Sequence, residues 1–237
     1  MEERVQLMER FASLGALAAG LHHEIKNPLT ALSIHVQLLE KRLDGPIPAK
    51  PVGELIGVVK AEIQRLNGVL DSFRDFASLR RLTIGPTDVP GLLEATRLLI
   101  GPLAQQQRVE VTLDCSGAPG LVPLDGDKFQ QAVLNLVINA LEAMPDGGRL
   151  RLAASARDGE IRVEVSDTGP GITTEIRQDP FKPYSSTKDR GTGMGLALSE
   201  KVVGQHGGRI GYRTGPGGTT FTIAIPLAPL CGTEGGP

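Results

Sequence analysis

Residues 127–140 read DKFQQAVLNLVINA, and this stretch decides how the second half of the chain folds. Its apolar residues recur every three or four positions, which predicts an amphipathic helix. Asn135 and Asn139 are four residues apart and therefore share one face of that helix. A buried amide without a hydrogen-bond partner costs about 1–3 kcal/mol. We therefore expect something polar to meet these two side chains.

The next block along the chain is VEVSDTGPGI at residues 163–172. The alternating pattern predicts a strand that ends at Asp167, followed by a turn containing Gly169 and Gly171. A carboxylate at a strand end can accept a hydrogen bond from an exocyclic amine, and glycines let the backbone approach a flat ring. Taken alone, the block could also be a plain glycine turn.

A third block, residues 181–198, contains Gly191, Gly193 and Gly195 just before a helical pattern. Glycines that lead into a helix N-terminus can hold phosphates through backbone N–H groups and the helix dipole. A Rossmann motif is excluded because the charged residues 188–190, not a hydrophobic strand, precede Gly191, and the P-loop motif GxxxxGK[ST] does not occur. We interpret the block as a glycine-hinged lid.

Around these blocks the sequence predicts a separate α+β domain that begins after residue 84. Strands are expected at residues 109–113, 161–165 and 219–225 because β-branched residues alternate there. Helices are expected at residues 89–107, 127–143 and 195–206.

The first half of the chain has a different texture. Large apolar residues recur in steps of three and four from Leu7 to Leu43 and again from Val52 to Ala77. Between the two runs, residues 44–51 contain the glycine and prolines that are typical of a turn. Pro28 predicts a local bend in the first helix. This pattern predicts an antiparallel helical hairpin. A lone hairpin cannot cover its own seam, so we expect a homodimer in which two hairpins form a four-helix bundle.

Within the first run, helix geometry separates two neighbouring histidines. At 100° per residue, His23 lies about 200° from both Leu21 and Ile25 and so faces away from the seam, whereas His22 flanks it. A histidine on a helix surface is most often simply solvated, and we read His22 in that way. Asn27 shares the face of His23. The adjacent Glu24 can accept a hydrogen bond from one ring nitrogen, which leaves the other as a neutral nucleophile.

The segment from His23 to Leu29 closely resembles the phospho-acceptor box of two-component sensor histidine kinases. The later blocks, in their order, resemble the N, G1, F and G2 boxes of the GHKL ATP-binding fold, and residues 217–221 match its terminal Gly-Thr element. The resemblance implies a hairpin domain for dimerisation and phosphotransfer at residues 1–84, a GHKL α/β sandwich at 85–230 and a flexible tail at 231–237.

The resemblance also implies a role for individual residues. His23 would be phosphorylated, with Glu24 and Asn27 as its catalytic neighbours, and Asn139 would ligate Mg²⁺ at the phosphates of ATP. The residues implied to bind the nucleotide are Asn135, Asn139, Asp167, Gly169, Gly171, Thr187, Lys188, Gly191, Gly193, Gly195 and Thr219. Glu142 departs from the basic residue that many sensor kinases carry at its position, which suggests the nitrogen-regulation branch.

The activity implied is autophosphorylation of His23 from ATP, followed by transfer to an aspartate on the receiver domain of a response regulator. Phosphatase activity toward that partner is a further possibility, with Asn27 positioning water. Two alternatives stay open: a non-catalytic, dimeric nucleotide-binding scaffold, and a GHKL ATPase that hydrolyses ATP with water. The second is disfavoured because water-activating relatives carry Glu at the position of Asn135, and an amide cannot act as a general base.

The composition excludes other classes of protein. The chain has 237 residues, with 25 Lys and Arg against 27 Asp and Glu, which gives a formal net charge of −2. A near-neutral chain lacks the cationic surface of nucleic-acid-binding proteins, so we expect no nucleic-acid partner. The longest apolar run, residues 11–21, is about half a bilayer-spanning helix. Two distant cysteines offer no disulfide framework. We expect a cytoplasmic chain without a membrane segment.

Overall fold

The computed structural model describes residues 25–39, 49–77, 82–173, 179–183 and 193–227. The chain divides into two compact units. We call the one built from residues up to 79 together with 183–194 the hairpin unit, and the one built from residues 80–182 and 195 onward the sheet unit.

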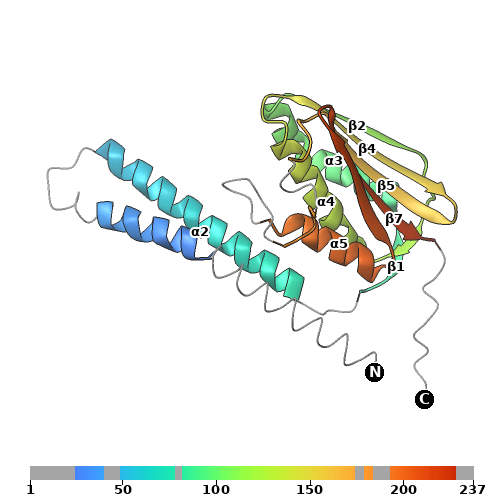
Figure 1. Ribbon diagram of the computed structural model, residues 1–237, viewed down its shortest axis with the longest axis horizontal. Coiled ribbons are helices and arrows are strands. Elements are labelled where there is room, and N and C mark those ends of the chain that lie inside the picture. Colours follow the sequence, from blue (N-terminus) through green and yellow to red (C-terminus); the bar gives the residue numbers. More distant parts are fainter. Residues whose placement is uncertain (1–24, 40–48, 78–81, 174–178, 184–192, 228–237) are drawn as a thin grey trace, which may run out of the picture. The chain divides into compact units, whose positions relative to one another are not determined.

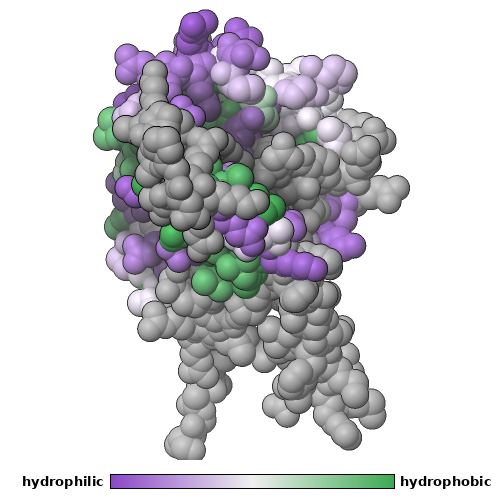
Figure 2. Space-filling model, turned by 90° about the vertical axis from the view of Figure 1, so that its left-hand side faces the viewer, coloured by the Kyte–Doolittle hydropathy of each residue, from purple (hydrophilic) through white to green (hydrophobic). Residues whose placement is uncertain are grey.

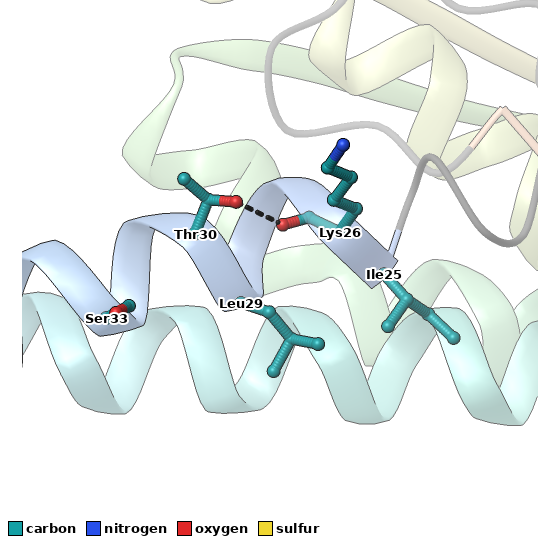
Figure 3. A pocket seen from close by; sticks show the side chains of 5 residues that line it. All are labelled: Ile25, Lys26, Leu29, Thr30 and Ser33. Carbon is teal, nitrogen blue, oxygen red and sulfur yellow. Dashed lines mark hydrogen bonds between the residues drawn. The ribbon is translucent and has the colours of Figure 1, made fainter.

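The hairpin unit contains a helix over residues 25–39 and helix α2 (Ala49–Ala77), which lie side by side (Figures 1 and 3). This agrees with the predicted hairpin; the rest of the first apolar run lies outside the described residues. Helix α2 begins at Ala49, three residues before the second apolar run, so the last three residues of the predicted turn stretch 44–51 are helical. Pro51 fits inside its first turn, since a backbone N–H there would have no intrahelical partner.

Large apolar side chains of the hairpin unit remain at its surface. Leu29 is 51% exposed, and on α2 Ile56, Ile63 and Leu70 are 43%, 46% and 48% exposed. These three α2 residues are spaced seven apart, so they form one stripe along the helix. Figure 2 shows hydrophobic groups beside strongly hydrophilic ones on one face of the molecule.

The sheet unit is built on a five-stranded sheet in the order β2-β4-β5-β7-β6. Its strands are β2 (Val109–Gly117), β4 (Gly148–Arg157), β5 (Glu160–Asp167), β6 (Arg209–Gly215) and β7 (Gly218–Pro226). β2 and β4 are parallel and the other neighbours are antiparallel. Burial alternates along β5, so one face of the sheet is covered and the other meets solvent.

Three helices cover the buried face of this sheet: α3 (Val89–Gln106), α4 (Gly126–Glu142) and α5 (Gly195–Gln205) (Figure 1). The core between the two layers includes Phe129 of α4 and Phe221 of β7, both fully buried. The predicted α/β sandwich is therefore confirmed, and each predicted helix of this unit ends within one residue of the observed one.

A small second sheet joins β1 (Gly85–Thr87) to β3 (Val122–Leu124) in antiparallel pairing. This sheet was not predicted from the sequence, because each strand has three residues with a proline at its centre, which weakens the strand signal. The pairing holds the start of the sheet unit against the residues just before α4.

Among the described helices, none combines the length and the apolar character that a bilayer crossing requires.

Candidate functional site

The end of β5 presents a buried carboxylate. Asp167 is 8% exposed, and its Oδ1 accepts hydrogen bonds from the backbone N–H of Gly169 at 2.9 Å and of Thr219 at 3.1 Å. Thr219 lies on β7, the strand that pairs with β5. Two donors from two segments therefore fix the orientation of this carboxylate, and a carboxylate offers acceptor positions on two oxygens.

Glycines surround Asp167 because larger residues do not fit. A Cβ at Gly218 would collide with the carbonyl of Asp167, and one at Gly171 would collide with the carbonyl of Gly215. Both glycines also have positive φ angles, +126° and +83°. A Cβ at Gly169 would lie 3.1 Å from the carbonyl oxygen of Ala143, the C-cap of α4. The turn after Asp167 thus lies against the end of α4.

Thr214 is a member of this cluster that sequence reasoning missed. Its Oγ1 accepts the backbone N–H of Ile172 at 2.8 Å and lies 3.1 Å from the Oγ1 of Thr219. Thr214 and Thr219 are register partners across the β6–β7 hairpin. The signal that could have found Thr214 was the short turn at residues 216–217, which places these two residues opposite one another once the hairpin register is assigned.

Helix α4 carries the two asparagines. Asn135 Nδ2 donates to the carbonyl oxygen of Gly195 at 3.2 Å, which ties α4 to the first residue of α5. Asn139 lies one turn further toward the end of α4, whose C-cap meets the Asp167 turn. The expected polar partner of Asn135 is therefore a backbone carbonyl at the base of the glycine-rich segment.

An aromatic group fixes the segment before the lid. Phe181 makes edge-to-face contacts with Tyr212 of β6, at 6.1 Å between ring centroids, and with Phe221 of β7, at 6.2 Å. Edge-to-face aromatic pairs stabilise packing beyond the burial of the apolar surface of each ring. The F-box segment is therefore anchored on the two strands that also carry Thr214 and Thr219.

Two acidic residues lie near one another at α5. Burial raises the pKa of the Glu200 carboxyl, and the negative charge of Asp179 raises this pKa further. Glu200 belongs to α5 and Asp179 to the segment just before Phe181. The neutral form of the Glu200 carboxyl is therefore favoured relative to a fully exposed glutamate.

Several expected site residues fall outside the described residues: His23, Glu24, Thr187, Lys188 and Gly191. Gly193 is described and has a φ of +63°, a conformation that favours glycine. Asn27 is exposed on the helix over residues 25–39; its predicted common face with His23 lies partly outside the described residues. The structure thus brings together Asp167, its glycines and Thr219, and separately joins Asn135 to Gly195.

The hairpin unit has a hollow of about 400 Å³ on the helix over residues 25–39, lined by Ile25, Lys26, Leu29, Thr30 and Ser33. Figure 3 shows Ile25 and Leu29 pointing toward α2, while Lys26 and Thr30 point away from it. Thr30 Oγ1 donates to the carbonyl oxygen of Lys26 at 2.9 Å. The residues that line the hollow therefore present apolar side chains toward α2 and polar side chains, including the cationic Lys26, on the other side.

Within the described residues there is no group of three or more His, Cys, Asp or Glu that could hold a metal ion. The amide oxygens on α4 still fit Mg²⁺, which takes hard oxygen ligands and is commonly bound by one or two protein groups together with phosphate oxygens. The amide oxygens of Asn135 and Asn139 are therefore compatible with Mg²⁺ as part of a larger ligand set.

Two family models match this chain. The model of the His Kinase A (phospho-acceptor) domain matches residues 13–82, and that of the histidine kinase-, DNA gyrase B- and HSP90-like ATPase matches residues 124–229. The signal transduction histidine-protein kinase AtoS of Escherichia coli K12 is 33% identical over 230 residues, which are 96% of this chain and 37% of AtoS. The chain thus spans less than half the length of this relative.

Solved structures share the fold. The histidine kinase ThkA, in its complex with the response regulator protein TrrA, matches with a TM-score of 0.81 at 24% identity, over 98% of this chain and 67% of that one. Full-length ShkA in complex with AMPPNP matches with a TM-score of 0.66 at 27% identity, over 90% of this chain and 46% of that one.

Proposed function

The chain belongs to the two-component sensor histidine kinases, of which it forms a catalytic core. We propose that it phosphorylates itself on His23 with ATP and Mg²⁺ and then passes the phosphoryl group to a response regulator. The observation that carries the proposal is the buried Asp167 carboxylate, held by Gly169 and Thr219 beside glycines that keep the backbone bare. A carboxylate in such a place suits the exocyclic amine of adenine.

We assign the nucleotide contacts as follows. Asp167 binds the adenine amine, Gly169 and Gly171 line the base, and Thr219 supports the carboxylate. Asn139 contributes an oxygen to Mg²⁺ at the phosphates, with Asn135 beside it. Thr187, Lys188, Gly191, Gly193 and Gly195 form the lid over the phosphates, where backbone N–H groups and positive charge offset the developing negative charge.

The acceptor chemistry is assigned to the hairpin unit. Glu24 accepts a hydrogen bond from one ring nitrogen of His23, and the other nitrogen attacks the γ-phosphorus in line with the leaving ADP oxygen. Water is a poor competitor because Asn135 stands where an activating Glu would be needed. We assign to Asn27, which is exposed and lies four residues after His23 in the sequence, the orientation of water when the partner is dephosphorylated.

The hairpin unit supplies the surfaces for partners. The stripe of Ile56, Ile63 and Leu70 fits a second copy of the chain packed into a four-helix bundle. The exposed side chains of Lys26 and Thr30, which point away from α2, are offered to the receiver domain. The name of the ThkA complex, which contains a response regulator protein, supports a partner of this kind.

Three further assignments belong to this proposal. The domain boundaries are residues 1–84, 85–230 and 231–237, the branch is that of the nitrogen-regulation kinases, and the compartment is the cytoplasm. Glu142 in place of a basic residue supports the branch. The AMPPNP bound by full-length ShkA supports ATP as the nucleotide.

The proposal is tested by incubating the chain with Mg²⁺ and γ-labelled ATP and examining the chemistry of the label. We expect an acid-labile, alkali-stable label that is lost in His23→Gln. His22→Gln is the matched control, because it changes the neighbouring histidine and leaves the acceptor in place. Steady release of phosphate without label would support the water-hydrolysing ATPase, and nucleotide binding with neither would support the scaffold.

A second variant tests the nucleotide site separately. Asp167→Asn keeps an oxygen for the two backbone donors but replaces the other oxygen with an NH₂ group, which cannot accept from adenine. We expect ATP affinity to fall by at least about tenfold, the loss expected for a charge-assisted hydrogen bond. Asp114→Asn, an exposed aspartate on β2, is the control. Unchanged affinity in Asp167→Asn would contradict the assignment of the adenine contact.

A further inference from the structure

Asp125 holds two segments with one side chain. It is 9% exposed and caps α4, where its Oδ1 accepts the backbone N–H of Lys128 at 3.1 Å. Its Oδ2 accepts the backbone N–H of Thr83 at 2.8 Å. Thr83 lies in the stretch between the end of α2 at Ala77 and the start of β1. The carboxylate that begins α4 therefore also fixes the entry into the sheet unit.

The backbone of Asp125 is held by a buried histidine. Its N–H donates to Nε2 of His206 at 3.0 Å, and Nδ1 of His206 is 2.8 Å from the carbonyl oxygen of Val202. Because Nε2 accepts, the ring proton is on Nδ1, which donates to Val202. His206 is 2% exposed and lies edge-to-face against Phe129 of α4. Burial lowers the pKa of His206, which favours the neutral ring that this bond requires.

Helices α4 and α5 are joined at both ends. At one end Asn135 bonds to Gly195, and in the middle Ser199 Oγ donates to the carbonyl oxygen of Ala132 at 3.0 Å. At the other end His206, which directly follows α5, bonds to Asp125. Asp125 and Asn135 are ten residues apart, about 15 Å along the helix. These bonds form a continuous connection between Asp125 and Asn135.

We infer that Asp125 and His206 are positioning residues that couple the segment at Thr83 to the nucleotide site. This inference rests on the proposed function, because the ligand whose binding is coupled is the nucleotide at Asn135 and Asn139. When Thr83 is bonded to Asp125, α4 and α5 are held in the arrangement that binds nucleotide, and bound nucleotide in turn holds Thr83 in place. Such coupling is reciprocal by thermodynamic necessity.

The test separates the bond to Thr83 from helix capping. Asp125→Ser keeps a good N-cap hydroxyl for α4 but has a single short oxygen and loses the acceptor for Thr83. The matched control is Asp88→Ser, because Asp88 caps α3 by accepting the backbone N–H of Gly91 at 3.1 Å and α3 carries no assigned nucleotide residue. The full chain is used, with a fluorescent, non-hydrolysable ATP analogue and Mg²⁺. Affinity and hydrogen exchange at the Thr83 amide are both measured.

We expect the analogue to slow exchange at Thr83 in the wild type and in Asp88→Ser but not in Asp125→Ser. Its affinity is expected to fall at least about fivefold in Asp125→Ser. If Asp125→Ser does not fold, His206→Phe takes its place, because it keeps a ring against Phe129 and removes the acceptor of the Asp125 N–H. We expect the same fall in affinity in that variant.

Two results would overturn the inference: a nucleotide response at Thr83 that persists in Asp125→Ser, or an equal loss of affinity in Asp88→Ser. A wild-type chain that does not bind the analogue would instead contradict the proposed function. In that case, hydrogen exchange at the Thr83 amide is compared without nucleotide. Faster exchange in Asp125→Ser than in the wild type supports the hydrogen bond between Asp125 and Thr83, and unchanged exchange contradicts it.

Discussion

The hairpin unit and the sheet unit treat their apolar residues in opposite ways. In the sheet unit the large side chains of α4 and β7, such as Phe129 and Phe221, are fully enclosed between helices and sheet. In the hairpin unit the residues at heptad spacing, such as Ile56, Ile63 and Leu70, stay between two-fifths and half exposed. The sheet unit thus completes its core within one chain, whereas two helices cannot enclose a seam between them.

This difference indicates how the two halves depend on concentration. The stability of a unit that closes its own core does not depend on other molecules, while a unit that needs a second copy gains stability by mass action. The proposed nucleotide contacts belong to the self-sufficient unit and the proposed acceptor belongs to the dependent one. We therefore expect ATP binding to survive dilution and the four-helix bundle to be lost on dilution.

The largest expected effect is on assembly. Ile63→Asp places a charge at the centre of the exposed stripe, where a dimer would bury it twice without a partner. We expect the dimer dissociation constant to rise at least about 100-fold, measured by analytical ultracentrifugation over a dilution series. ATP affinity is expected to stay within about twofold, because the sheet unit closes its core by itself.

Gln64→Asp is the control for this variant, since Gln64 is the exposed neighbour of Ile63 on α2 and lies outside the heptad positions. It adds the same charge to the same turn. If Gln64→Asp dissociates the dimer as strongly as Ile63→Asp, charge and not the apolar stripe controls assembly. A wild-type chain that is monomeric at all concentrations would contradict the proposed homodimer.

The next effect concerns the sheet unit. In Gly218→Ala the new Cβ would collide with the Asp167 carbonyl at a φ of +126°, so β7 must shift away from β5. We expect the free energy of unfolding to fall by about 2–4 kcal/mol, measured by urea unfolding. Gly211→Ala is the control, because a Cβ at Gly211 meets nothing within 4 Å. Equal losses in the two variants would mean that the close approach at Asp167 is not what requires glycine.

The helices and the candidate site differ in how far the sequence could predict them. Helices α3, α4 and α5 were predictable because long periodic apolar patterns dominate local alternatives. A glycine turn at positions 169 and 171 was predictable, because a strand that ends in Asp followed by glycines is typical of a tight turn; that these glycines line a base stays a prediction. Thr214 was not, because its role arises only from the register of the β6–β7 hairpin, which is a non-local property.

The contacts of Asp125 show a second limit of sequence reasoning. As an N-cap before an apolar periodic stretch it has a recognisable signature. Its bonds to Thr83 and His206 join residues that are 42 and 81 positions apart, which no local pattern reports. Pairings of this kind depend on how the finished layers meet, so they become visible only in the folded chain.

The smallest expected effect is a pH dependence confined to the sheet unit. Burial holds the pKa of His206 below its ordinary value of 6.5, with the bond to Val202 and the charge of Asp125 acting in the opposite direction. As the pH falls below about 6.5, His206 becomes protonated in the unfolded chain but stays neutral in the folded chain. The contribution of His206 to the free energy of unfolding is therefore complete above that pH and is lost as the pH falls toward the pKa of the folded state. Protonation would also remove the acceptor of the Asp125 N–H.

Urea unfolding followed by tyrosine fluorescence at pH 7.5 and 5.5 measures this effect, since Tyr212 lies in β6 and the chain has no tryptophan. His206→Gln cannot titrate but can still accept from Asp125, so we expect a smaller loss of stability on acidification than in the wild type. His35→Gln removes a histidine of the hairpin unit instead and is expected to keep the wild-type loss. The opposite result would be that His35→Gln reduces the loss of stability between pH 7.5 and 5.5 and His206→Gln does not. In that case the acid-sensitive group belongs to the hairpin unit, and the stability of the sheet unit depends less on pH.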